Sequence, residues 1–258
     1  MRTLIDFDDA PVFAVPTAAG LREGVLLDGP QGWGEFSPPA GADDALAARW
    51  LTAAMEPSTV GWPDAVRGRV PVSDGLRPVV EVDDVAAAVD AIMRVADDVE
   101  LVEVICRSCD DARSVRRLVD VPVAVDAALL AVDPQCADVA VLRCGALGGV
   151  RRALRRAEKL GLPAVVNFTG TTSIGLAADV ALAAALPDLP FACGQVPEWL
   201  RDSDVVSSPR SLVPSDGHLP AAPMPAAPDP ARLARFAVTD PDVVGRWRDL
   251  LHRAAALI

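Results

Sequence analysis

The sequence predicts an α/β protein in which a small α+β unit precedes a sheet of parallel strands. From residue 69 to residue 193, short β-branched runs alternate with segments of helical apolar spacing. These runs are apolar on both faces, which is typical of parallel strands covered by helices. With 258 residues and a hydrophobic content of 51%, the chain can bury a large core in one or two domains. The pattern leaves open whether the sheet closes into a barrel.

Residues 1–68 are predicted to form the α+β unit. Residues 24–27 and 32–36 are short β-like runs joined by Asp28-Gly29-Pro30-Gln31, a hairpin-type turn. Residues 43–55 show helical apolar spacing, and Pro57 is expected to end that helix.

Residues 69–194 are predicted to form the parallel domain, and 195–258 to pack back against the first unit. Strands are expected at 70–72, 79–82, 101–105, 121–125, 139–142, 163–167 and 191–193. Helices are expected at 84–95, 110–118, 150–160 and 173–186. Residues 219–230 are rich in proline and predicted to be extended, whereas 241–258 have the spacing of a closing helix.

Charge and composition exclude several classes of function. The net charge is −12, and no stripe of Lys and Arg alternates with aromatic residues, which argues against nucleic-acid or membrane binding. The most apolar segment, 174–186, is too short to span a bilayer, and the first ten residues lack the apolar run of a signal peptide. The five cysteines are an odd number at mixed spacings, so we expect a reducing, cytoplasmic location.

The supply of catalytic side chains is small. Lys and Arg together number 24, and only one of them, Lys159, is a lysine; there is no tyrosine and only two histidines, His218 and His252. Any mechanism that needs two lysines is therefore excluded by counting. Both histidines lie outside the predicted βα region with no visible Cys, Asp or Ser partner for catalysis, so we interpret both as surface or packing residues.

Three carboxylates lie in or just past predicted strands: Asp83, Glu103 and Asp126. Acidic groups around the mouth of a parallel sheet could bind Mg²⁺, which prefers hard oxygen ligands. The alternative is that they are helix caps and solvated loop acids, since the chain has 36 acidic residues.

A second candidate site lies at residues 169–173, between a predicted strand and a helix. Hydroxyl groups and free backbone N–H groups at a helix N-terminus can bind an anion, and the candidate ligands here are Thr169, Thr171, Thr172 and Ser173. Ordinary helix capping by Thr172 or Ser173 is the competing interpretation.

Three further patterns have a plainer interpretation. Cys106 and Cys109 form a lone CxxC with no second pair or histidine, which favours buried structural thiols. Residues 145–149 resemble a phosphate-binding turn but lack its glycine spacing and lysine, so a plain connection is favoured. The arginine run at 151–156 is interpreted as a solvated helix face.

Several segments in series resemble one family. Residues 29–36 read GPQGWGEF, 69–72 read RVPV, 121–126 read VPVAVD, and DP follows at 133–134. Further along, 138–143 read DVAVLR, 147–150 read LGGV, 183–187 read AAALP, and 192–194 read ACG. This ordered series resembles the actinobacterial o-succinylbenzoate synthases of the enolase superfamily.

The resemblance implies an α+β capping domain on a modified, here shortened, TIM-type barrel. Members of the family bind Mg²⁺ through an Asp, a Glu and an Asp at the ends of three successive strands, which correspond to Asp83, Glu103 and Asp126. Two lysines act at the α-carbon of the substrate. The metal stabilises an enediolate, and loss of water gives o-succinylbenzoate for menaquinone biosynthesis.

The chain departs from the family pattern at the catalytic lysines. No strand carries the family's Lys-x-Lys, and Val72 passes almost directly to Val79, so one or two βα units are missing. Arg143 stands at the position of the second lysine. Arginine is not deprotonated in proteins and cannot act as the base, but it can hold positive charge beside an enolate.

Three functional hypotheses follow. The residue chemistry favours a degenerate member with weak or no dehydratase activity that keeps a binding or scaffold role, with a small carboxylate as the expected ligand. The second hypothesis is an active, metal-dependent o-succinylbenzoate synthase. The third is different chemistry on the same scaffold, using Cys106, Cys144 or Cys193. A barrel that lacks a unit must either close with fewer strands or stay open with exposed strand edges. Exposed edges would favour a covering chain, so we expect a homo-oligomer or a protein partner at an open edge.

Overall fold

The computed structural model describes residues 5–75 and 77–258. An antiparallel sheet in the order β1-β2-β3 consists of β1 (Val12–Thr17), β2 (Gly20–Gly29) and β3 (Gly32–Phe36). The predicted hairpin is confirmed, since β2 and β3 pair with Leu27 opposite Gly34. β1 was not predicted.

The first helix, α1 (Asp44–Thr59), packs against this sheet and runs through Pro57. The prediction that Pro57 ends the helix is wrong. The helix continues for two residues past the proline, and in this last turn the hydroxyl groups of Ser58 and Thr59 donate to the carbonyls of Ala54 and Met55.

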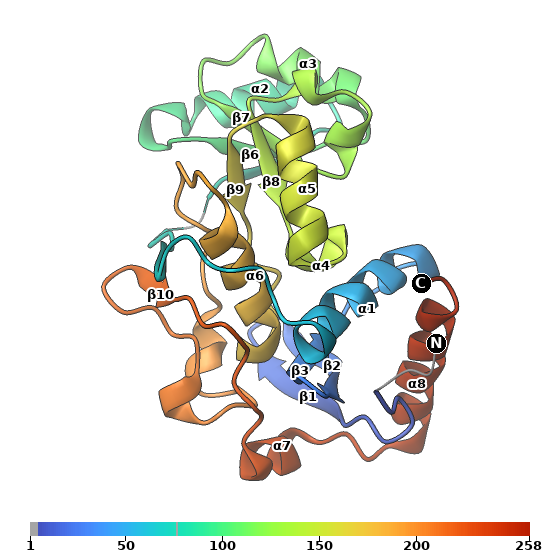
Figure 1. The fold of residues 1–258 in the computed structure, drawn as a ribbon. Helices are drawn as coiled ribbons and strands as arrows, with labels where there is room; N and C mark the ends of the chain where they lie inside the picture. Colours follow the sequence, from blue (N-terminus) through green and yellow to red (C-terminus); the bar gives the residue numbers. More distant parts are fainter. Residues whose placement is uncertain (1–4, 76) are drawn as a thin grey trace.

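A parallel sheet in the order β5-β6-β7-β8-β9 confirms the predicted α/β class. Its strands are β5 (Val79–Glu81), β6 (Val102–Ile105), β7 (Val123–Asp126), β8 (Val139–Leu142) and β9 (Ala164–Val166). The helices that follow them are α2 (Val85–Met93), α3 (Cys109–Arg116), α4 (Cys144–Leu147), α5 (Val150–Leu160) and α6 (Ser173–Ala185). Short 3₁₀ helices lie at Ala96–Asp98, Leu129–Ala131, Pro134–Cys136, Glu198–Arg201 and Ser208–Arg210. Figure 1 shows this sheet at the top, above the antiparallel sheet and α1.

The sheet continues on the β9 side through a short bridge. The N–H of Gly194 donates to the carbonyl of Val166 at 2.9 Å, and the N–H of Cys193 donates to that of Pro71 at 2.8 Å. This brings in β4 (Arg69–Pro71), whose other edge pairs with β10 (His218–Pro220) in antiparallel fashion. The strand predicted at 191–193 is thus reduced to a single bridge, from Cys193 to Val72.

The barrel does not close between β4 and β5. Within the described residues, β5 pairs only with β6, and its other edge is free. Val79 on β5 is 51% exposed, because the strand that would cover its inner side is missing. The interior of the barrel is therefore open to solvent on this side.

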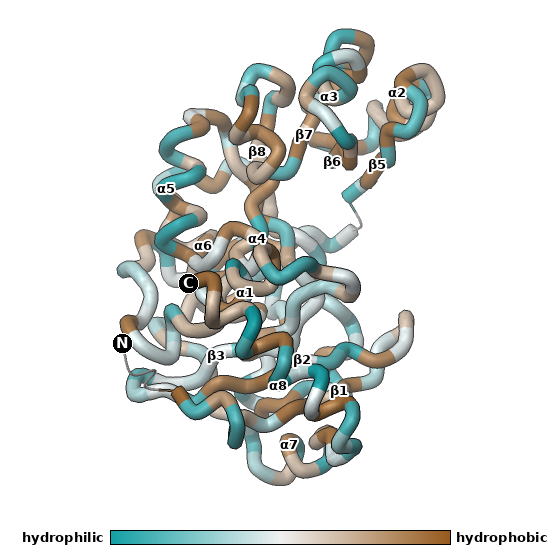
Figure 2. Tube along the Cα trace, turned by 90° about the vertical axis from the view of Figure 1, so that its right-hand side faces the viewer, coloured by the Kyte–Doolittle hydropathy of each residue, from teal (hydrophilic) through white to brown (hydrophobic). Residues whose placement is uncertain are grey.

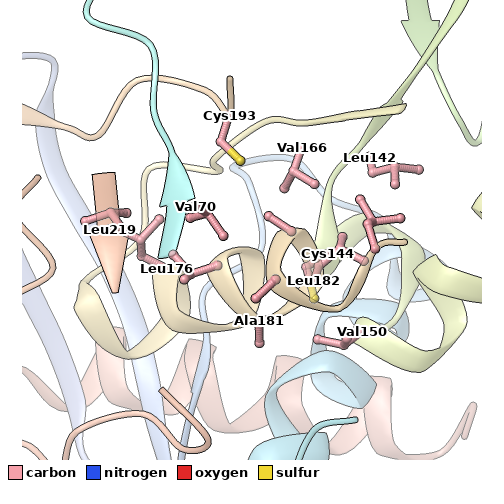
Figure 3. Close-up of a cluster of buried hydrophobic side chains, with 14 of the residues drawn as sticks. Val70, Leu142, Cys144, Val150, Val166, Leu176, Ala181, Leu182, Cys193 and Leu219 are labelled. Atoms are coloured by element: carbon pink, nitrogen blue, oxygen red, sulfur yellow. The ribbon is translucent and has the colours of Figure 1, made fainter. Parts of the chain in front are cut away.

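Each face of the parallel sheet has its own buried cluster. Inside, Leu101, Ala124, Val139, Val141 and Val165 form an apolar layer. Outside, strand residues of opposite parity pack against α2 and α3, as strand alternation requires. A third cluster gathers side chains from β4, β8, β9 and β10 around α6 (Figure 3).

The C-terminal segment returns to the first unit. α7 (Pro230–Phe236), which was not predicted, leads to α8 (Pro241–Ala255), where a closing helix was expected. Trp247 and Leu251 of α8 are buried against Ala47 and Leu51 of α1.

No helix among the described residues is both long and apolar enough to cross a membrane.

Candidate functional site

A guanidinium group lies between two carboxylates at the carboxyl ends of the parallel strands. Arg143 directly follows β8, Glu103 is on β6, and Asp126 ends β7. The Arg143 Nη1 donates to Asp126 Oδ2 at 2.7 Å, and its Nη2 donates to Glu103 Oε1. The Glu103 side chain is only 2% exposed, so this pairing offsets the cost of burying its charge.

Strand register brings these three residues to the inner face. Glu103 pairs with Ala124, and Asp126 pairs with Val141, so two-residue steps keep every side chain of the group on one side. The apolar inner layer lies below them. The result is a polar layer at the barrel mouth above an apolar floor, the arrangement in which barrel enzymes place their sites.

Two further residues extend this cluster. Asn167, just after β9, donates through Nδ2 to Glu103 Oε2, and Arg77 Nη1 donates to Asn167 Oδ1 at 2.7 Å. Burial lowers the pKa of the Arg77 guanidinium, and the charge of Glu103 opposes that shift. Two arginines therefore balance two carboxylates. We refer to these five residues, Arg77, Glu103, Asp126, Arg143 and Asn167, as the mouth cluster.

Asp83, the third predicted metal ligand, lies outside the mouth cluster. β5 pairs Val79 with Glu103, so Asp83 lies four positions further along the chain, beyond the end of the strand. Its carboxylate pairs with Arg107 at 3.2 Å, and both side chains are largely exposed. In the ranges 5–75 and 77–258, no three Asp, Glu, His or Cys residues are grouped as a metal would require. With both remaining carboxylates bonded to Arg143, the donor set does not fit a divalent cation.

The predicted anion ligands Thr172 and Ser173 are occupied by the protein's own carboxylates. Thr172 caps α6, and its hydroxyl donates to Glu35 of β3. The Ser173 hydroxyl donates to Asp204, from the segment after β9 and α6. Backbone N–H groups at the start of α6 reinforce both contacts: Gly175 donates to Glu35 at 3.1 Å and Ser173 to Asp204 at 3.2 Å. The favourable anion position at this helix end is thus filled from within.

Thr169 and Thr171 face a different carboxylate and a small cavity. Thr169 Oγ1 donates to Asp179 Oδ2 at 3.2 Å. The Thr171 hydroxyl and the Trp50 indole N–H are buried without a protein partner, and both residues line a cavity of about 20 Å³ together with Asp179. Such a volume admits about one water molecule. Burial raises the pKa of Asp179 to about 7, against hydrogen bonds from Cys144 and Thr169 that lower it.

The glycine turn at 145–149 also binds an internal carboxylate. Glu56 of α1 accepts from the N–H groups of Val150 and Arg151, at 2.5 and 3.2 Å, at the start of α5. Gly149 has φ +107°, and a Cβ there would lie 2.4 Å from Glu56 Oε2. The turn therefore serves to bring α1 onto α5.

The thiols proposed for alternative chemistry are held in the neutral form. Burial raises the pKa of Cys193 to about 12 and that of Cys144 well above its usual value. Cys106 is partly buried, and burial raises its pKa too. Since the thiolate is the nucleophile, these environments do not favour covalent chemistry at cysteine.

Sequence reasoning missed most of the buried polar partners. Asn167 directly follows β9, at the same edge of the sheet as Glu103 and Asp126, and that position could have singled it out. The carboxylates of Glu35, Glu56 and Asp204 carry no such signal, because each contacts a helix more than 30 positions away in the chain.

Comparison with family models identifies two matching regions. Residues 19–58 match the model described as enolase N-terminal domain-like, and residues 79–228 match the model described as enolase C-terminal domain-like. The first match spans β2, β3 and nearly all of α1, and the second spans the parallel sheet from β5 to β9.

Two relatives in the comparison carry the name o-succinylbenzoate synthase. An o-succinylbenzoate synthase from Thermobifida fusca is 39% identical, over 78% of this chain and 81% of the relative. Another from Mycolicibacterium smegmatis is 34% identical, over 86% of both chains.

Solved structures share the fold at lower identity. A muconate lactonizing enzyme from Pseudomonas putida has a TM-score of 0.69 at 17% identity, covering 89% of this chain and 98% of its own. An enolase from Mycobacterium smegmatis complexed with tartrate has a TM-score of 0.64 at 16% identity, covering 93% of this chain and 94% of its own. These confirm the enolase-type α/β fold with a capping domain.

Proposed function

The chain belongs to the o-succinylbenzoate synthase family of the enolase superfamily, and from that membership we propose that it is a member with little or no dehydratase activity. It keeps the family scaffold and serves a binding role at the barrel mouth. Two guanidinium groups there, those of Arg77 and Arg143, favour a small carboxylate as the ligand.

The observation that carries this proposal is the position of Arg143. Its guanidinium bonds two of the three carboxylates that the family pattern assigns to the metal, Glu103 and Asp126. A divalent cation could reach them only if Arg143 left, and Asp83 would still be engaged with Arg107. No metal-dependent step fits this arrangement, because a side-chain cation already satisfies the donors.

The second support is the lack of a base at the barrel mouth. Lys159 is exposed on α5, outside the barrel. His252 pairs with Asp8 on the surface, and His218 contacts the backbone of Asp216. Asp179, whose pKa is near neutrality, faces a cavity too small for a substrate. Loss of a catalytic acid or base typically slows a reaction by about 10²–10⁴-fold, and the family reaction uses two.

An active, Mg²⁺-dependent o-succinylbenzoate synthase is the alternative. It is favoured by 39% identity to the Thermobifida fusca enzyme over 81% of that enzyme's length. It would require Arg143 to swing aside and a carboxylate or water to act as base.

A turnover assay separates the two. The protein is incubated with the family's cyclohexadiene-carboxylate substrate in Mg²⁺, in Mn²⁺ and in EDTA, with the Thermobifida fusca enzyme as the positive control. We expect no product above the uncatalysed rate in any of the three conditions.

Product that forms at a rate comparable to that of the Thermobifida fusca enzyme, depends on metal, disappears in EDTA and is lost in Asp126→Asn would overturn the proposal. A circular dichroism spectrum of the same preparation establishes that the inactive protein is folded.

A further inference from the structure

Five cationic side chains surround one hollow on the outside of the barrel. The hollow has a volume of about 690 Å³ and lies where α1, α4, α5 and the segment after β7 meet. The cations are Arg49, Arg152, Arg155, Arg156 and Lys159. We call this surface the basic hollow. None of the residues lining it is acidic.

These cations have no carboxylate partner within the described part of the chain. What sets these five apart is that they surround a single hollow in a protein of net charge −12. Elsewhere, positions that attract anions are filled internally: Glu56 occupies the start of α5, and Glu35 and Asp204 occupy the start of α6. The basic hollow is a strongly positive surface that the chain does not neutralise itself.

Local geometry gathers the charges on one side of α5. Arg152, Arg156 and Lys159 are four and three positions apart, so they share a helix face. Gly148 has φ +82°, and a Cβ there would come within 3.0 Å of the Arg152 side chain, so the glycine lets Arg152 lie over the turn. β7 and β8 are joined only by short 3₁₀ helices, so no longer helix from that connection covers this face. Figure 2 shows long hydrophilic stretches along α5.

We propose that the basic hollow binds a small molecule that carries a polyphosphate group. Its volume is that of a small-ligand site. Four planar guanidinium groups match phosphate oxygens in paired hydrogen bonds, and like charges held together unpaired favour a ligand with several negative charges. No aromatic side chain lines the hollow to stack with bases, and the acidic remainder of the molecule repels extended polyanions such as RNA. The hollow is outside the barrel, so this proposal does not depend on the activity of the mouth cluster.

The test is calorimetric titration of the full chain with pyrophosphate and with tripolyphosphate at low and moderate salt. We expect saturable binding that is tighter for tripolyphosphate and weakens as salt screens the charges. The double variant Arg152→Glu/Arg156→Glu should weaken binding by more than about tenfold, since it removes two phosphate partners and adds repulsion.

The matched control is Arg94→Glu/Arg201→Glu, which makes the same change in net charge at two exposed positions away from the hollow, one just after α2 and one in a 3₁₀ helix. It should bind as the wild type does. Absence of binding by the wild type, or equal loss in both double variants, would overturn the proposal. Binding of a 20-nucleotide RNA in place of the small polyphosphates would overturn it too. Circular dichroism of each variant checks the fold.

Discussion

The side chain of Arg143 neutralises two carboxylates at the barrel mouth, those of Glu103 and Asp126. Glu103 is almost completely buried, and a buried carboxylate without a partner is strongly unfavourable. Arg143 supplies a hydrogen-bonded counter-charge to it and to Asp126 at once, and Asn167 takes the second oxygen of Glu103. Both carboxylate oxygens of Glu103 therefore have hydrogen-bond partners from the protein itself.

Asp179 lacks such a counter-charge, and its stability contribution should depend on pH. Its usual pKa is 3.8, and burial raises the folded value to about 7. Between pH 4 and pH 7 the folded state therefore binds more protons than the unfolded state, so stability falls as pH rises through this window. Asp179→Asn removes this titration, and we expect the variant to be more stable than the wild type at pH 8 by about 2 kcal/mol. Chemical unfolding of the wild type and of Asp179→Asn at several pH values measures how the free energy of unfolding of each depends on pH.

Thr169→Val is the companion variant. It removes a hydroxyl donor that lowers the pKa of Asp179, so the loss of stability should move to higher pH. If Asp179→Asn keeps the wild-type dependence on pH, the decrease arises from other groups, and the assignment to Asp179 is wrong.

At the scale of elements, carboxylates that are distant in sequence bind the two helix N-termini next to the barrel mouth. Glu56 reaches the start of α5 only because Gly149 has no side chain there. Gly149 also has φ +107° and ψ 171°, a region open in practice to glycine alone. Glycine is therefore required at position 149 for two reasons: its backbone conformation and the close approach of the Glu56 carboxylate.

Gly149→Ala is expected to destabilise the protein by about 3 kcal/mol, because it adds backbone strain and displaces Glu56. Gly161→Ala at the other end of α5 is the control: it has φ +64° but nothing within 4 Å of a new Cβ. That variant should lose only about 1 kcal/mol. Equal losses in the two variants, measured by urea unfolding, would mean that contact with Glu56 contributes nothing.

The same elements indicate what a sequence can predict. β8 and α5 have the predicted limits, because periodicity and β-branched runs are local signals. β10 was missed, since three residues next to prolines form a strand only by pairing with β4.

At the site, the grouping of Glu103, Asp126 and Arg143 follows from strand order. Their mutual bonding depends on register and side-chain reach, which the sequence does not state. Asp83 was grouped with them for its place after a strand, and the β5 register sets it apart.

At the scale of the whole molecule, the start of α6 is where three parts of the chain meet. Glu35 comes from the antiparallel sheet and Asp204 from the C-terminal segment, whereas α6 follows β9, the last strand of the parallel sheet. Both carboxylates are buried and accept several hydrogen bonds there. In a barrel that is open between β4 and β5, such contacts hold the capping unit onto the rest.

Glu35→Gln should therefore weaken the packing of the capping unit against the barrel more than it destabilises either of them alone. The carboxylate accepts from the hydroxyls of Ser37 and Thr172 and from the N–H of Gly175, whereas the glutamine amide nitrogen can accept from none of them. We expect a loss of about 2–4 kcal/mol. We also expect denaturant transitions by tryptophan fluorescence and by far-ultraviolet circular dichroism to separate, where those of the wild type coincide.

Glu23→Gln provides the comparison within the capping unit. Glu23 on β2 accepts from Arg246 and Trp247 of α8, so its loss acts between parts of the same unit. That variant should lower the midpoint and keep the two transitions coincident. If Glu35→Gln also unfolds in one coincident transition, the capping unit and the barrel are held together mainly by their apolar contacts, and the buried carboxylates at α6 serve only that helix.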